Sequence, residues 1–132
     1  MSTRISSRIT LKYVPDGQPL PVNISRPLVE WVLENLIKNA VDAMEGAGSI
    51  TITSSIENRF ACIDVTDTGK GIPRKRQKTI FNPGYTTKKR GWGLGLTLAK
   101  RIVEQYHDGR IFVLSSEPGS GTTFRILIPL AD

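Results

Sequence analysis

The chain has 132 residues, of which 39% are hydrophobic and 23% charged, with a formal net charge of +6. This length predicts one domain over residues 1–132, with a core that needs no disulfide bonds. No apolar run reaches the ~20 residues that span a bilayer, and the start of the chain lacks the apolar segment of a secretory signal. The single cysteine, Cys62, provides no zinc or disulfide framework and is predicted to be a buried core thiol. We therefore expect a soluble, cytoplasmic domain without direct membrane contact.

The first half of the chain alternates short strand and helix signals. Apolar and polar residues alternate at 8–14, which predicts a strand, and a proline-rich loop follows. Ser25 and Pro27 carry the cap and first-turn signals of a helix that runs to about Met44 and ends at Gly46. Its predicted apolar face consists of Leu33, Leu36, Ile37, Ala40, Val41 and Met44.

The second half reads as two strand pairs separated by a long loop and a helix. A loop as long as 67–93 is uncommon in a compact domain unless it is functional. The order of elements predicts an α+β fold, with helices on one face of a mostly antiparallel sheet. The expected elements are strands at 49–56 and 59–66, a short helix at 73–80, a helix at 94–106, and strands at 110–116 and 122–129.

The positive charges gather in two clusters. Aromatic residues do not interleave with them, as they do on platforms that stack single-stranded nucleic acid, so we expect no nucleic-acid partner. The clusters either form ordinary solvated loops or supply positive potential around a polyphosphate. They consist of Arg74, Lys75, Arg76 and Lys78, and of Lys88, Lys89 and Arg90.

The first helix carries a polar stripe beside its apolar face. Asn35, Asn39 and Asp42 follow at spacings of one helical turn, whereas Glu34 points farther away. The stripe is either a set of solvated amides or a site, and two asparagines are poor choices for a helix without a purpose. Because asparagine oxygens suit Mg²⁺ alongside phosphate oxygens, Asn39 and Asn35 are predicted metal ligands.

Asp67 directly follows a predicted strand and opens the loop Asp67-Thr68-Gly69-Lys70-Gly71. A carboxylate there can accept a hydrogen bond from an exocyclic amine, which distinguishes adenine from guanine. Gly69 and Gly71 permit positive φ and the close approach of a ring. The same pattern is also typical of an ordinary turn.

A glycine run precedes the second long helix. Phosphate binding needs backbone N–H groups without side chains in the way and a helix N-terminus directed at the anion. Lys88 stands just before the run, and Phe81 and Tyr85 are predicted anchors at the base of a lid. The predicted cradle is Gly91, Gly93, Leu94, Gly95 and Leu96. His107 closes the helix and is interpreted as a capping cation that favours the helix dipole.

Five motifs in order resemble the catalytic, ATP-binding domain of two-component sensor histidine kinases, in the Bergerat-fold ATPase superfamily. The resemblance covers residues 8–130. The sequence has no Walker-type G-x-x-x-x-G-K-[ST] motif, so we expect it to bind a nucleotide by another architecture. The N box is at 34–40, the first glycine box at 67–72, the F box at 80–88, the second glycine box at 91–96 and the last at 119–124.

The resemblance implies a two-layer α/β sandwich of about three helices on a mixed sheet, binding ATP and Mg²⁺. Asn39 would coordinate Mg²⁺ with Asn35 assisting, and Asp67 would bind the adenine amino group. Thr122 would help Asp67 through a water. Gly69, Gly71 and Ile72 would form the pocket floor, and Lys88 and residues 91–96 would hold the phosphates.

The implied activity is phosphoryl transfer from ATP to a histidine on a separate dimerisation domain of a longer kinase, which serves a response regulator in turn. The chain shows no phosphoacceptor histidine motif of its own, its lid (82–90) is short, and Asp42 stands where many relatives carry lysine or histidine. Asn35 stands where hydrolysing relatives carry a glutamate, and Glu34 is a weaker catalytic candidate. The alternatives are a freestanding protein-serine kinase of the anti-sigma-factor type and a non-catalytic nucleotide-binding module.

Overall fold

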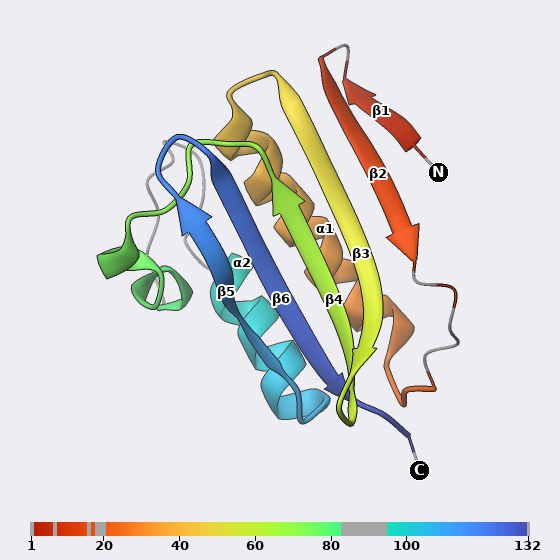
Figure 1. The fold of residues 1–132 in the computed structure, drawn as a ribbon. Helices are drawn as coiled ribbons and strands as arrows, with labels where there is room; N and C mark the ends of the chain where they lie inside the picture. Colours follow the sequence, from red (N-terminus) through yellow and green to blue (C-terminus); the bar gives the residue numbers. More distant parts are fainter. Residues whose placement is uncertain (1, 7, 16, 18–20, 83–94, 132) are drawn as a thin grey trace.

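The computed structural model in Figure 1 describes residues 2–6, 8–15, 17, 21–82 and 95–131. Six strands form one sheet in the order β1-β2-β3-β4-β6-β5, in which β2 and β3 run parallel and the other neighbours antiparallel. The mixed, mostly antiparallel sheet predicted from the sequence is confirmed. The strands are β1 (Ser2–Ser6), β2 (Ile9–Pro15), β3 (Gly48–Glu57), β4 (Phe60–Asp67), β5 (Arg110–Glu117) and β6 (Gly121–Pro129).

Strand β1 is the one strand that the sequence analysis missed. It pairs antiparallel with β2, with Ser2 opposite Lys12, and lies at the edge of the sheet. Its sequence Ser-Thr-Arg-Ile-Ser holds a single large apolar residue, Ile5, so the alternation that signals a half-buried strand is weak. The other five strands lie within two residues of their predicted bounds.

The helices cover one face of the sheet, behind the strands in Figure 1. Helix α1 (Arg26–Met44) buries Val29, Val32, Leu36, Ala40 and Met44 against the sheet, while the predicted Leu33, Ile37 and Val41 are half-buried beside them. It ends at Glu45, whose φ of 52° is left-handed, followed by Gly46 at 100°. The predicted stop is confirmed, because glycine adopts positive φ without strain.

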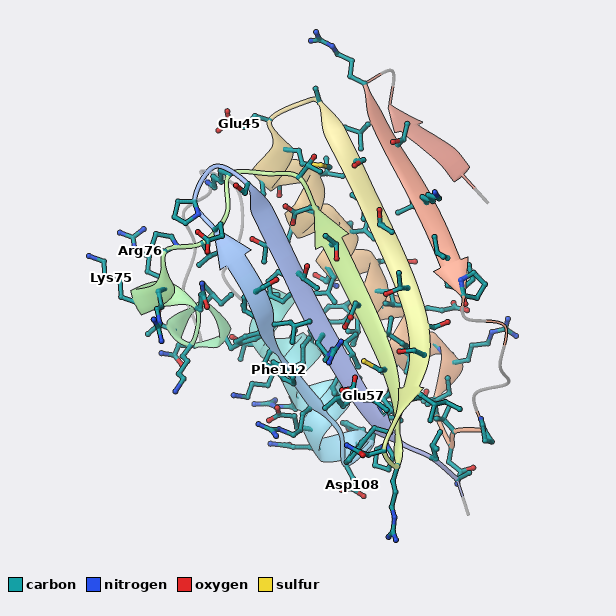
Figure 2. All side chains as sticks on the ribbon, in the orientation of Figure 1. Glu45, Glu57, Lys75, Arg76, Asp108 and Phe112 are labelled. Carbon is teal, nitrogen blue, oxygen red and sulfur yellow. The ribbon has the colours of Figure 1, made fainter. Side chains whose placement is uncertain are left out.

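The later helical segments are less regular than predicted. The predicted helix at 94–106 is described from Gly95 as α2 (Gly95–Arg101), which continues as the π-helix η3 (Ile102–Tyr106). The predicted helix at 73–80 is two 3₁₀ turns, η1 (Arg74–Arg76) and η2 (Thr79–Phe81). Figure 2 shows Lys75 and Arg76 of η1 pointing away from the sheet into solvent. Among the described residues, no helix is long and apolar enough to cross a membrane.

His107 differs from its predicted role as a charged cap. The side chain is buried, its Nε2 accepts a hydrogen bond from the Ser25 N–H (3.0 Å), and its Nδ1 contacts the Ile102 carbonyl (2.8 Å). A carbonyl only accepts, so Nδ1 carries the proton and Nε2 carries none. Neutral His107 thereby joins the end of η3 to the start of α1, where the Ser25 side chain itself makes no capping bond.

Cys62 is buried as predicted, but on the face of β4 opposite to the helices. It stands three positions from the core residue Val65, and alternate strand residues point to opposite faces. Its Sγ lies 3.9 Å from a Glu57 oxygen and 3.8 Å from an Asp64 oxygen. Burial, with the Asp64 charge second, raises the pKa of the thiol, so this cysteine is not an activated nucleophile.

Candidate nucleotide-binding site

The first and the last of the predicted glycine boxes meet at one end of the sheet, the upper end in Figure 1. Asp67 closes β4 and lies opposite Thr122 at the start of β6. The loop after Asp67 is fixed on two sides: the Lys70 N–H donates to the Ala43 carbonyl of α1 (2.9 Å), and the Lys70 carbonyl accepts from Gly119 of the β5–β6 turn (2.7 Å). The first glycine box therefore lies between the N-box helix and the last glycine box.

Asp67 is a buried carboxylate, 5% exposed. Its Oδ1 accepts from the Gly69 N–H (2.8 Å), and the backbone of Thr122 also hydrogen-bonds the carboxylate. Desolvation by burial raises the pKa of Asp67 above its ordinary value, against the opposing effect of these two bonds. A buried carboxylate that is still short of stabilising donors is a suitable acceptor for an incoming amine.

The two glycines of this loop are needed for packing as well as for any ligand. A Cβ at Gly69 would lie 2.7 Å from the Ala43 carbonyl oxygen, and one at Gly71 would lie 2.2 Å from the Glu117 carbonyl oxygen. The predicted positive φ is present at Gly71 (77°). At both glycines the close neighbour is protein backbone. The sequence pattern alone could not distinguish this packing requirement from the close approach of a ligand ring.

Ser116, at the end of β5, makes contacts beside this loop that no sequence motif indicated. Ile72 packs against the core, and its N–H donates to Ser116 Oγ (2.7 Å). Ser116 Oγ also lies 2.8 Å from Thr122 Oγ1 and 3.1 Å from the Gly121 carbonyl oxygen. A serine at the end of a strand has no distinctive spacing, so only the fold shows that it belongs here.

The polar stripe of α1 faces the start of α2. The Asn35 Nδ2 donates to the Trp31 carbonyl of its own helix (2.9 Å), which leaves Oδ1 directed toward Gly95. A Cβ at Gly95 would come within 2.7 Å of that oxygen. Asn39 lies one turn farther along α1 and is half-buried, whereas Glu34 is exposed.

The F box is held at its first residues. Phe81 is buried and packs edge-to-face on Phe124 with 6.1 Å between ring centroids, and its carbonyl accepts from Thr97 Oγ1 of α2 (2.8 Å). Phe81 is thus a core residue, as predicted, while the lid that it would hold lies outside the described residues. Leu96 of the cradle packs against the core. Lys88, Gly91, Gly93 and Leu94, with Tyr85, lie outside the described residues.

The donors at this end fit a metal–nucleotide better than a metal bound by protein alone. In the part of the chain that the structure describes, no three His, Cys, Asp or Glu side chains gather to hold a metal ion. Asn35 of α1 presents a neutral amide oxygen toward Gly95. A hard cation prefers six oxygens, so phosphate and water would have to supply most of them.

Comparisons with known proteins agree on the family. The family model described as "Histidine kinase-, DNA gyrase B-, and HSP90-like ATPase" matches residues 25–132. The signal transduction histidine-protein kinase AtoS of Escherichia coli K12 is 39% identical over 127 residues, which are 96% of this chain and 21% of AtoS. Sporulation kinase C of Bacillus subtilis 168 is 38% identical over 109 residues, 83% of this chain and 25% of that kinase. The chain thus spans about a fifth to a quarter of the length of these relatives.

Solved structures show the same fold. The catalytic domain of the histidine kinase ThkA superposes with a TM-score of 0.80 at 34% identity, over 92% of this chain and 78% of that one. The structure of ThkA in complex with the response regulator protein TrrA superposes with a TM-score of 0.78 at 32% identity, over 93% of this chain and 34% of that one. The α+β fold and the resemblance to sensor histidine kinase catalytic domains are confirmed. This chain belongs to the histidine kinase-, DNA gyrase B- and HSP90-like ATPase family.

Proposed function

We propose that this chain binds ATP with Mg²⁺ and donates the γ-phosphoryl group to a histidine on a separate dimerisation domain. The observation that carries the proposal is the pairing of buried Asp67 with Thr122 at one end of the sheet, where the Lys70 N–H also bonds the Ala43 carbonyl of the helix that carries the N-box asparagines. The relatives that match are four to five times longer than this segment of them, which leaves room for an acceptor domain in a longer parent protein. A response regulator would receive the phosphoryl group afterwards.

Each group has a distinct task in this proposal. Asp67 accepts from the adenine amino group, with Thr122 beside it, and residues 69–72 form the pocket floor. Asn39 and Asn35 hold the metal, and Lys88 with the backbone amides of residues 91–96 holds the phosphates. When bound, Mg²⁺ would neutralise charge on the phosphate oxygens. Phosphoryl transfer depends mainly on such positioning and charge stabilisation.

Water is a poor competitor for the phosphoryl group in this site. An amide does not accept a proton at neutral pH, so Asn35 cannot act as the base that a glutamate supplies in hydrolysing relatives. Glu34 is exposed on α1 and projects about 100° away from Asn35 around the helix. We therefore expect slow ATP hydrolysis by the chain alone.

The test is phosphotransfer in trans. The purified chain is mixed with ATP labelled at the γ-phosphate, Mg²⁺ and the purified dimerisation domain of the parent protein. Acid-labile label should appear on that domain's histidine only when the chain is present. Asn39→Ala should lower the affinity for ATP about tenfold, which corresponds to about 1.4 kcal/mol, the free energy of one good ligand contact. The affinity of the variant for ATP should also depend less on Mg²⁺. Lys38→Ala, exposed on the same helix, is the matched control.

Three results would contradict the proposal. Label on a serine of a partner would indicate a protein-serine kinase instead. ATP binding without transfer to any acceptor would indicate a non-catalytic module. Equal ATP affinity of the parent chain and Asn39→Ala would remove Asn39 from the site.

A further inference from the structure

Ser116, Thr122 and Asp67 form a row across the end of the sheet. Thr122 of β6 lies opposite Ser116 of β5 on one side and opposite Asp67 of β4 on the other. Paired residues in neighbouring strands share a face, and this face is the one covered by the helices, because it also carries Phe124 and Val65. Ser116 is therefore one side chain removed from the acceptor proposed for adenine, and it belongs to none of the five motifs.

The hydrogen atoms around Ser116 can be counted. Its Oγ makes three contacts: with the Ile72 N–H (2.7 Å), the Gly121 carbonyl (3.1 Å) and Thr122 Oγ1 (2.8 Å). Three protons serve these contacts, one each from Ile72, Ser116 and Thr122. The Gly121 carbonyl has none to give, so the Ser116 proton goes there. The remaining contact then takes its proton from the Thr122 hydroxyl.

This assignment fixes the polarity of Thr122. With its proton committed to Ser116, Thr122 Oγ1 presents only lone pairs to the space beside Asp67. The Asp67 carboxylate, when ionised, is also a pure acceptor. Both groups then favour an amine, or a water that donates to Thr122, and both disfavour a carbonyl at the same position.

We propose that Ser116 is a positioning residue that makes the site prefer a 6-amino purine to a 6-oxo purine, by holding the Thr122 hydroxyl as an acceptor. The inference rests on the proposed ATP site and adds to it a residue and a cause of base selectivity. Ser116 does not touch the nucleotide; it acts through Thr122 and through the Ile72 N–H. Replacing its hydroxyl frees the Thr122 proton, which can then turn toward a purine carbonyl.

The test is a competition of ATP and GTP, each with Mg²⁺, against a fluorescent ATP analogue on the purified chain. Ser116→Ala should lower the ratio of ATP to GTP affinity about tenfold, the value of one hydrogen bond. Ser115→Ala is the matched control, because Ser115 is exposed and points to the opposite face. Thr122→Val should lower the ratio similarly, and Ser116→Ala should add nothing in that background.

If Ser116 had a merely structural role, Ser116→Ala would weaken the binding of ATP and of GTP equally. The ratio of the two affinities would then be unchanged, which would overturn the inference. So would a Thr122→Val variant with the selectivity of the parent chain, and that measurement stands even if Ser116→Ala does not fold. Rescue of the ratio by Ser116→Thr, which keeps the hydroxyl, would support it. A parent chain that binds neither nucleotide would overturn the proposed function instead.

Discussion

At the scale of single residues, Asp67 shows function and stability in opposition. Burial raises its pKa above the ordinary value of 3.8, so the folded chain holds the proton more tightly than the unfolded chain does. The stability that this proton contributes is present below 3.8 and is lost as the pH rises through the folded-state pKa. Ionisation of Asp67 therefore costs folding free energy.

Asp67→Asn tests this balance. We expect its ATP affinity to fall at least tenfold, about 1.4 kcal/mol, because an amide replaces a pure acceptor. Urea unfolding of the nucleotide-free chains, compared from acidic to neutral pH, should show the variant gaining stability relative to the parent as the pH rises. A stability difference that stays constant, or that shifts in favour of the parent as the pH rises, would mean that Asp67 is not desolvated as the fold indicates.

At the scale of elements, two contacts join the helices that carry the site. Asn35 of α1 approaches Gly95 at the start of α2, and His107 after η3 accepts from Ser25 at the start of α1. The π-helix immediately precedes His107, and Ile102, its first residue, accepts from the ring. Helix α1 is thus located by His107 at its start, by α2 at its middle and by the sheet that it covers.

His107→Ala leaves the Ser25 N–H and the Ile102 carbonyl without their ring partner in a partly buried position. We expect the free energy of unfolding to fall by about 2 kcal/mol, since unsatisfied buried polar groups cost ~1–3 kcal/mol each and some solvent will enter. The measurement is urea denaturation, with the exposed neighbour Gln105→Ala as control. Equal stability of the two variants would show that this contact does not hold α1 in place.

At the scale of the whole molecule, the two faces of the sheet are stabilised differently. The helix-covered face is apolar, whereas Arg125 on the other face forms a two-bonded ion pair with Asp64 (2.8 and 2.9 Å) and reaches Glu57 at 3.1 Å. Arg125 and Asp64 are only 19% and 17% exposed. Hydrogen bonding to Asp64 raises the pKa of Arg125 further, so the guanidinium stays charged.

Asp64→Asn should cost about 3 kcal/mol of stability, because it leaves a largely buried guanidinium with only the more exposed Glu57 as counter-charge. The comparison variant is Glu30→Gln, whose partner Arg26 is 86% exposed, and it should change stability by less than about 0.5 kcal/mol. ATP affinity should be unchanged in both, since neither residue lies at the site. Similar unfolding midpoints for the two variants would show that the pair is solvated in practice.

Much of this fold was predictable from short stretches of sequence. Residues close together in the chain account for three features. These are the alternation along β3, β4 and β6, the ends of α1 and the burial of Phe81. Predictions failed where the local signal was weak or shared: polar β1 lacked alternation, and His107 had a plausible charged role. The burial of Cys62 was predicted correctly, but nothing local to it indicated which face of the sheet it occupies. Ser116 had no signal at all.

The family, the order of elements and the motif residues follow from the sequence alone, because capping, turn geometry and hydrophobic period are encoded within a few neighbouring positions. Only the tertiary structure decided that β2 pairs parallel with β3, that Asp67, Thr122 and Ser116 lie in one row, and that Ser25 meets His107. These contacts join residues far apart in the chain. They are selected by burial and hydrogen bonding summed over the whole sheet and its helices, which no local window contains.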